Sequence, residues 1–194
     1  MAPLDAILRS WAGPSFARIP CRTPSSLHTL GVGLAAVSGG AVFCTMADTV
    51  MPDAAWHGLF GQMRAAFACG ADSVLAVTPH VGDSGGLYVE RDGHGRLTAF
   101  RDAPPVPDTP AAPVGPVLVT GGVYGLGPEA RGLALEALGA GVDRMRGYLR
   151  LLLDRGLDVR AVEVPRIIDL DHRSDLEHAN AWLGAPSHAT SPEA

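Results

Sequence analysis

The chain has little positive charge and few cysteines. Of its 194 residues, 15 are basic and 20 are acidic, so the formal net charge is −5. Nucleic-acid-binding domains usually present a basic face, and this balance therefore argues against a nucleic-acid partner. A nucleotide is not excluded, because a metal ion and local donors can neutralise its phosphates. The three cysteines, Cys21, Cys44 and Cys69, have no metal-type spacing, which favours buried free thiols in a cytoplasmic protein and leaves a disulfide possible.

Long uninterrupted apolar runs are also lacking. Residues 28–47 carry no charge, but several glycines break this run into a helical pattern and a strand pattern, so we expect no membrane span. The first 11 residues contain no basic segment followed by a long apolar core, and no signal peptide is evident. The content of 47% hydrophobic residues predicts a single globular domain over residues 1–184, with residues 185–194 as a loose tail.

The segment that ends near Asp48 is the most informative part of the chain. Residues 40–50 combine a short apolar run with β-forming residues between glycines and a polar turn, which predicts a buried strand. Asp48 stands where this strand ends. Ligands of open α/β sheets bind beyond the carboxyl ends of strands, so this carboxylate is well placed to hold a divalent cation. The alternative is that Asp48 only caps a helix that starts near Asp53.

Helical and strand patterns alternate along the chain. An apolar stripe from Leu27 to Val37 predicts a helix with Ser25 or Ser26 as its N-cap. Residues 92–95 predict the turn of a hairpin. The other expected elements are a helix at 53–67, strands at 73–78, 86–91, 96–101, 117–124 and 157–164, an exposed proline-rich loop at 102–116, helices from Pro128 and at 143–154, and a last helix behind a capping box at 174–177. The order predicts a three-layer α/β/α sandwich around a mixed, mainly parallel sheet.

Four segments together resemble the nucleotidyltransferases that make activated sugars, the NDP-sugar pyrophosphorylase family. They are residues 23–30 (TPSSLHTL), 42–50 (VFCTMADTV), 120–124 (TGGVY) and 168–179 (IDLDHRSDLEHA). The resemblance implies a nucleotide-diphospho-sugar transferase-like, Rossmann-like fold. It also implies transfer of a nucleotidyl group from a nucleoside triphosphate to a sugar 1-phosphate or similar small phosphate, with Mg²⁺ as cofactor and pyrophosphate as a product.

The resemblance further implies roles for individual residues. Asp48 and Asp169 would be the catalytic residues that hold Mg²⁺, with Asp171 close by. Two carboxylates on one Mg²⁺ would offset the repulsion between two anionic substrates. From the residues alone, ordinary helix capping and a favourable interaction with the last helix dipole stay open as alternatives. The implied substrate-binding residues are Thr23, Ser25, Ser26, Arg101, Gly121, Gly122 and Tyr124.

Two departures from the family pattern bear on function. The family begins with a strand and a Gly-rich phosphate loop, and no such segment occurs here, so we expect the chain to lack roughly one βαβ unit of about 30 residues or more. Residues 100–102 read Phe-Arg-Asp where the family has Glu-Lys-Pro, so Arg101 would replace the lysine. An alternative function is therefore that of a catalytically inactive or truncated relative that binds a ligand or partner.

Two further expectations concern other enzymes and partners. A sugar transferase is disfavoured, because such enzymes usually carry an Asp-x-Asp pair after the central strand and Asp48 has no such partner. A missing first unit would expose strand edges, and a second copy of the chain in a homodimer could cover them.

Overall fold

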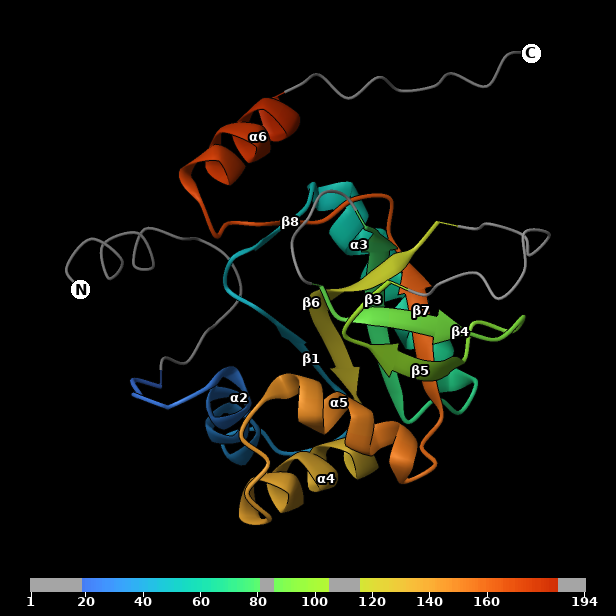
Figure 1. Ribbon diagram of the computed structural model, residues 1–194. Helices are drawn as coiled ribbons and strands as arrows, with labels where there is room; N and C mark the ends of the chain where they lie inside the picture. Colours follow the sequence, from blue (N-terminus) through green and yellow to red (C-terminus); the bar gives the residue numbers. More distant parts are fainter. Residues whose placement is uncertain (1–18, 81–85, 105–115, 185–194) are drawn as a thin grey trace.

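The computed structural model describes residues 19–80, 86–104 and 116–184 (Figure 1). The main sheet has six strands in the order β5-β4-β6-β3-β7, and β1 pairs with β6 beside this path. The strands are β1 (Val42–Thr45), β3 (Ser73–Pro79), β4 (Tyr88–Arg91), β5 (Leu97–Arg101), β6 (Leu118–Leu126) and β7 (Val159–Glu163). The expected tail at 185–194 lies outside the described residues, as do residues 1–18 and most of the expected loop at 102–116.

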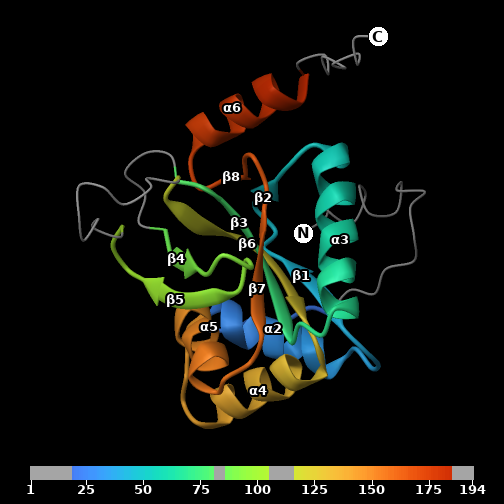
Figure 2. The same cartoon turned by 90° about the vertical axis from the view of Figure 1, so that its right-hand side faces the viewer.

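Helices cover both faces of the main sheet (Figure 2). One face carries α3, and the other carries α2, α4 and α5. The last helix, α6, follows β8 and lies apart from these layers (Figure 1). The helices are α2 (Ser26–Ala35), α3 (Asp53–Ala68), α4 (Pro128–Gly139), α5 (Met145–Asp154) and α6 (Arg173–Gly184), and a separate two-stranded sheet joins β2 (Thr49–Val50) to β8 (Ile168–Asp169). None of the described helices is long and apolar enough to cross a membrane.

The layers follow from the apolar pattern of β3. Leu75 and Val77 point into the core below α2, α4 and α5, whereas Val74 and Ala76 point into the core below α3. A strand that is buried on both faces has a continuous apolar run, and residues 74–77 form such a run. The three-layer α/β/α sandwich and the mixed sheet predicted from the sequence are therefore confirmed.

The direction of the strands differs from the prediction. In the described sheet, the β3–β7 pairing is the parallel one, whereas β6 runs antiparallel to β1, β3 and β4, and β4 runs antiparallel to β5. The prediction of a mainly parallel sheet is wrong, because a local apolar pattern does not encode strand direction. β5 and β6 point the same way, because both run antiparallel to the strand β4 that lies between them.

The predicted strand at 40–50 is two short strands. A turn at Ala47 and Asp48 separates β1 from β2. Residues of β1 alternate between half-buried and exposed, since successive side chains of a strand face opposite sides of the sheet. Among the described strands, β1 pairs with β6. The prediction that this segment is a buried strand is therefore wrong, although Asp48 does follow the strand.

The capping box of α6 also differs from the prediction. The backbone N–H of His172 donates to the carboxylate of Asp175 at 2.7 Å, so the helix begins at Arg173. Glu177 instead lies 3.7 Å from the guanidinium of Arg173. The cysteines are free, as one sequence interpretation held, but Cys21 and Cys69 are exposed rather than buried.

The hairpin of β4 and β5 covers the outer side of β7. The backbone N–H of Ala161 donates to the carbonyl of Gly95 at 2.9 Å, and Arg96 forms an antiparallel bridge with Arg160. The carboxylate of Asp158 accepts hydrogen bonds from Arg160 and lies 3.1 Å from Arg96. These contacts fix the hairpin across the sheet.

We expect Asp158→Asn to lower the free energy of unfolding by about 1 kcal/mol at pH 7, because it weakens bonds to two partly exposed arginines. The hydrogen bond from Arg160 holds the pKa of Asp158 below its ordinary value. The stability that the ionised Asp158 carboxylate contributes is therefore present above the unfolded pKa of about 4. It is lost as the pH falls through the lower folded pKa. Urea unfolding at pH 7 and pH 3 checks this. Asp154→Asn, at the exposed end of α5, is the control, and an equal loss in both variants would contradict the assignment.

Candidate functional site

Asp48 and Asp169 lie next to each other at one end of the main sheet. The antiparallel pairing of β2 with β8 places Thr49 opposite Asp169. The backbone N–H of Leu170 donates to the carbonyl of Asp48 at 3.0 Å. The structure therefore brings together the two carboxylates that the sequence analysis selected, and their role as metal ligands stays a prediction.

The electrostatics of this pair is unfavourable when both groups are ionised. Partial desolvation raises the pKa of Asp169 above its ordinary value, and the negative charges of Asp48 and Asp171 raise it further. Thr49 opposes this shift, because its hydroxyl donates to the carboxylate of Asp169 at 3.4 Å. A positive charge between two such carboxylates would relieve their repulsion.

The donor set fits a magnesium ion that is shared with a substrate. In the part of the chain that the structure describes, no group of three or more His, Cys, Asp or Glu side chains could hold a metal by itself. Mg²⁺ is commonly held by one or two carboxylates, and water and substrate phosphates complete its octahedron. Asp48 and Asp169 could supply the two carboxylates of such a site.

Gly121 and Gly122 lie in β6 where its edge passes from β1 to β4. Thr45 of β1 pairs with Val123, whereas Tyr88 of β4 pairs with Val119. The backbone N–H of Met46 donates to the carbonyl of Gly122 at 2.9 Å. The two glycines are thus next to the turn that carries Asp48.

The space above both glycines is filled by the protein's own side chains. Gly122 has a φ of +71°, and a Cβ there would lie 2.8 Å from the Oγ1 of Thr49. A Cβ on Gly121 would lie 2.0 Å from the Cδ1 of Ile167. The family resemblance implies a substrate-binding role for these glycines, and in the structure Thr49 and Ile167 approach their backbone. The predicted sugar-lining role is untested.

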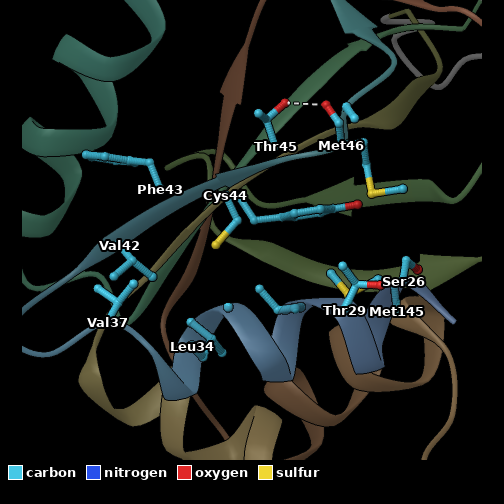
Figure 3. Close-up of a pocket in the computed structure, with 14 residues that line it drawn as sticks. Ser26, Thr29, Leu34, Val37, Val42, Phe43, Cys44, Thr45, Met46 and Met145 are labelled. Carbon is cyan, nitrogen blue, oxygen red and sulfur yellow. Dashed lines mark hydrogen bonds between the residues drawn. The ribbon is translucent and has the colours of Figure 1, made fainter. Parts of the chain in front are cut away.

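A cavity of about 480 Å³ lies between α2 and β1 (Figure 3). Its walls are mainly aliphatic and sulfur-containing side chains, and none of its described lining residues is charged. Its polar lining residues include Ser26, Thr29 and Thr45. The lining residues are Ser26, Thr29, Leu30, Gly33, Leu34, Val37, Val42, Phe43, Cys44, Thr45, Met46, Ala47, Tyr124 and Met145.

Tyr124 connects the cavity to the acidic pair. The ring lines the cavity, and burial raises the pKa of its phenol to about 12, with smaller contributions from Asp169 and Asp48. The phenol is therefore neutral at physiological pH. A neutral ring between an apolar cavity and two carboxylates can exclude water from one side of the acidic site.

The predicted residues at the start of α2 have different roles: one caps the helix and another lines the cavity. Ser25 is the N-cap of α2, and its hydroxyl accepts from the backbone N–H of His28 at 3.4 Å. The hydroxyl of Thr23 lies 2.5 Å from that of Thr29. Ser26 lines the cavity together with Thr29. The sequence analysis missed Thr29, although its position one helical turn after Ser26 could have identified it.

The structure does not bring Arg101 to the acidic pair. Its guanidinium forms a 2.8 Å ion pair with Glu90 across the hairpin. Arg101 is absent both from the residues that line the cavity and from the groups that shift the pKa of Asp169. Its predicted role as a phosphate ligand therefore gains no support from its position.

Comparison with known proteins identifies the fold. No protein-family model and no curated protein sequence matches the chain. A glucose-1-phosphate thymidylyltransferase, so described, from Bacillus anthracis aligns with a TM-score of 0.69 and 16% identity, over 94% of this chain and 72% of that chain. The inositol-1-phosphate CTP transferase from T. maritima aligns with a TM-score of 0.60 and 12% identity, over 82% of this chain and 62% of that chain.

A third structure agrees with these two. The nucleoside-diphosphate-sugar pyrophosphorylase from Vibrio cholerae RC9 aligns with a TM-score of 0.55 and 17% identity, over 87% of this chain and 68% of that chain. The chain thus has the nucleotide-diphospho-sugar transferase-like fold that the sequence resemblance implied, and it matches less than two thirds of the length of the T. maritima enzyme. Identities this low establish the fold and not the reaction.

Proposed function

We propose that the chain is a Mg²⁺-dependent nucleotidyltransferase. It would transfer a nucleotidyl group from a nucleoside triphosphate to a sugar 1-phosphate or similar small phosphate, and release pyrophosphate. The observation that carries this proposal is the pairing of β2 with β8, which joins Asp48 and Asp169 on a fold shared with nucleotidyltransferases.

Each group near the acidic pair has a part in this proposal. Asp48 and Asp169 would hold Mg²⁺, which when bound would neutralise phosphate charge between the two substrates. Thr49 orients the carboxylate of Asp169 through its hydroxyl. Tyr124, which lines the cavity, would keep water from that side of the acidic pair. Ser26 and Thr29 would offer hydroxyls to polar edges of an otherwise uncharged part of a substrate.

A second candidate function is nucleotide binding without transfer. The specific observation in its favour is the scarcity of cationic side chains, since no arginine among the described residues lines the cavity and the sequence contains no lysine. A triphosphate carries more negative charge than one Mg²⁺ neutralises, and transferases usually add lysine or arginine contacts. With the metal alone, a bound triphosphate would be held but turned over poorly.

One experiment distinguishes the two functions. The full chain is incubated with Mg²⁺, each of the four nucleoside triphosphates and a panel of sugar 1-phosphates, and released pyrophosphate is measured. The proposal predicts release that needs both substrates and the metal. Metal-dependent nucleotide binding without release would favour the second function, and neither binding nor release would contradict both.

The raised pKa of Asp169 predicts a pH-dependent response to divalent cations. Without a cation, the stability that proton binding at Asp169 contributes is present below the unfolded pKa of about 4 and is lost as the pH rises through the higher folded pKa. At pH 7 a bound cation would instead stabilise the folded state, because it interacts with the ionised carboxylate of Asp169. We therefore expect Mg²⁺ or Mn²⁺ to raise the melting temperature at pH 7 but not at pH 4.

Differential scanning fluorimetry checks this response. Asp169→Asn is the matched variant, since it removes the titrating group and should abolish the cation effect at pH 7. An equal cation effect in the wild type and in Asp169→Asn would exclude this carboxylate from the cation site.

A further inference from the structure

β6 bulges at Gly121 and Gly122, next to the small sheet of β2 and β8. The register of the β3–β6 pairing shifts between Leu75 and Val77, where β3 has one residue and β6 has three, 121–123, between the paired positions. A bulge leaves extra residues outside the ladder and redirects the backbone. The bulge of β6 therefore presents a short stretch of backbone without side chains to the segments that pass over it.

The small sheet places two side chains on this bulge. β2 and β8 lie together at one end of the main sheet (Figure 2). In β2, the Oγ1 of Thr49 would lie 2.8 Å from a Cβ on Gly122, and Thr49 is only 9% exposed. Directly before β8, the Cδ1 of Ile167 occupies the space that a Cβ on Gly121 would need, and Ile167 also packs against the apolar core beneath α3. Contacts to both glycines thus join the small sheet to the main one.

Ile167 lies where the chain crosses from the main sheet to the small sheet. Before the crossing, the backbone N–H of Val164 donates to a carbonyl of β3 at 2.8 Å. After it, Asp169 belongs to β8. Of the residues between Val164 and β8, Pro165 and Arg166 are exposed, whereas Ile167 is partly buried and reaches the core. The side chain of Ile167 therefore ties the start of β8 to the main sheet.

The small sheet needs an anchor of this kind, because its own pairing is short and its acidic groups repel each other. β2 and β8 have two residues each. A two-stranded ladder without other support is at best marginally stable in water. The ionised carboxylates of Asp48 and Asp169 add a repulsion that favours separation of the two strands. An apolar contact with the main sheet opposes this separation without adding charge to the site.

We propose that Ile167 is a positioning residue, which places Asp169 beside Asp48 by packing the start of β8 onto Gly121. With β8 held over the bulge, the backbone N–H of Leu170 reaches the carbonyl of Asp48 at 3.0 Å and joins β8 to the turn before β2. This role of Ile167 does not depend on the proposed function. Only its effect on cation affinity rests on that function.

Amide hydrogen exchange, followed by NMR on the full chain, tests this role, because the amide of Leu170 reports the contact between β8 and the Asp48 turn. Ile167→Val removes the Cδ1 methyl that packs on Gly121 and should speed exchange of the Leu170 amide about three- to tenfold. Val74→Ala is the control, because Val74 is fully buried in the same core but belongs to β3, and it should leave that amide unchanged. An unchanged Leu170 amide in Ile167→Val, or an equal rise in Val74→Ala, would overturn the proposal.

A complementary pair of substitutions tests the contact itself. Gly121→Ala adds a methyl in the space that the Cδ1 of Ile167 occupies, and it should speed exchange of the Leu170 amide at least about tenfold. Gly121 does not have a positive φ, so the backbone accepts alanine and the effect comes from this contact. In Gly121→Ala/Ile167→Val, the new methyl replaces the one removed, and exchange should return to within about threefold of the wild type. A double variant that recovers nothing would contradict the packing of Ile167 on Gly121.

Affinity for Mn²⁺ in the presence of a nucleoside triphosphate separates this role from the proposed function. Gly121→Ala should weaken Mn²⁺ binding about five- to tenfold, because displacement of β8 moves one of the two carboxylates, and the double variant should regain most of the loss. Equal affinity in the wild type and in Gly121→Ala would contradict the positioning role. A wild type that binds no Mn²⁺ would instead contradict the proposed function, and the Leu170 amide would still decide the role of Ile167.

Discussion

Replacing either Asp48 or Asp169 with asparagine is expected to lower pyrophosphate release about 100-fold or more. An asparagine keeps the shape of the side chain but removes the charge that would hold the cation. Removal of one preorganised electrostatic contact to a developing charge typically costs about 10²–10³ in rate. The two residues come from separate parts of the chain and meet through β2 and β8, so neither can compensate for the loss of the other.

The same variants should not unfold the protein. The negative charge of Asp48 raises the pKa of Asp169, which means that the ionised pair is repulsive in the folded state without a cation. Either asparagine removes that repulsion, so the melting temperature without cation should stay the same or rise. Asp171→Asn is the control, because Asp171 is exposed and follows β8. We expect pyrophosphate release by this variant to fall by less than about tenfold. Wild-type rates in Asp48→Asn would remove Asp48 from the site.

The second large effect is expected for Gly122→Val. A left-handed φ of +71° is strained for any residue with a Cβ, and most of all for a β-branched one. The new side chain would also meet the Oγ1 of Thr49 at 2.8 Å and the Cγ of Met46 at 3.2 Å. We expect a loss of about 2–4 kcal/mol in the free energy of unfolding, from backbone strain together with overpacking.

This variant should also impair the site. Displacement of Thr49 shifts β2, and with it the carboxylate of Asp48 relative to that of Asp169. Urea unfolding measures the stability, and cation-dependent nucleotide binding measures the site. Gly132→Ala in α4 is the control, because a Cβ there meets nothing within 4 Å and should stabilise the helix by about 0.5–1 kcal/mol. A Gly122→Val protein as stable as the wild type would contradict the close approach of β2 to β6.

The elements that could be predicted from the sequence are those in which a local pattern decides the structure. The apolar run of β3 requires burial on both faces, and the structure provides it. Ser25 caps α2, and Pro128 opens α4, because an N-cap hydroxyl and a fixed φ are local properties. The turn at residues 92–95 closes the predicted hairpin for the same reason.

Features that depend on distant contacts could not be predicted in this way. Whether β6 runs parallel or antiparallel to β3 depends on how the chain returns to the sheet. The exposure of β1 depends on which neighbours the strand has, and the 40–50 pattern is equally consistent with burial. Arg101 pairs with Glu90 because the hairpin places them on the same side of two adjacent strands. Thr29 enters the cavity only because β1 packs over α2.

The candidate site depends partly on local sequence patterns and partly on contacts between distant segments. Asp48 was found from its position after a strand, and Asp169 from its resemblance to a family motif. Their proximity required the pairing of β2 with β8, which no local pattern encodes. The roles predicted for Gly121 and Gly122 stay predictions, and a Cβ at either position would meet the protein's own side chains.

The most direct test of the central claim is a double-mutant cycle on cation binding. Affinity for Mn²⁺ in the presence of a nucleoside triphosphate is measured by electron paramagnetic resonance for the wild type, Asp48→Asn, Asp169→Asn and the double variant. If the two carboxylates hold one ion, each single variant weakens binding at least about tenfold and the double variant loses much less than the sum of the two. Unchanged affinity in either single variant, or losses that add fully, would contradict a shared site.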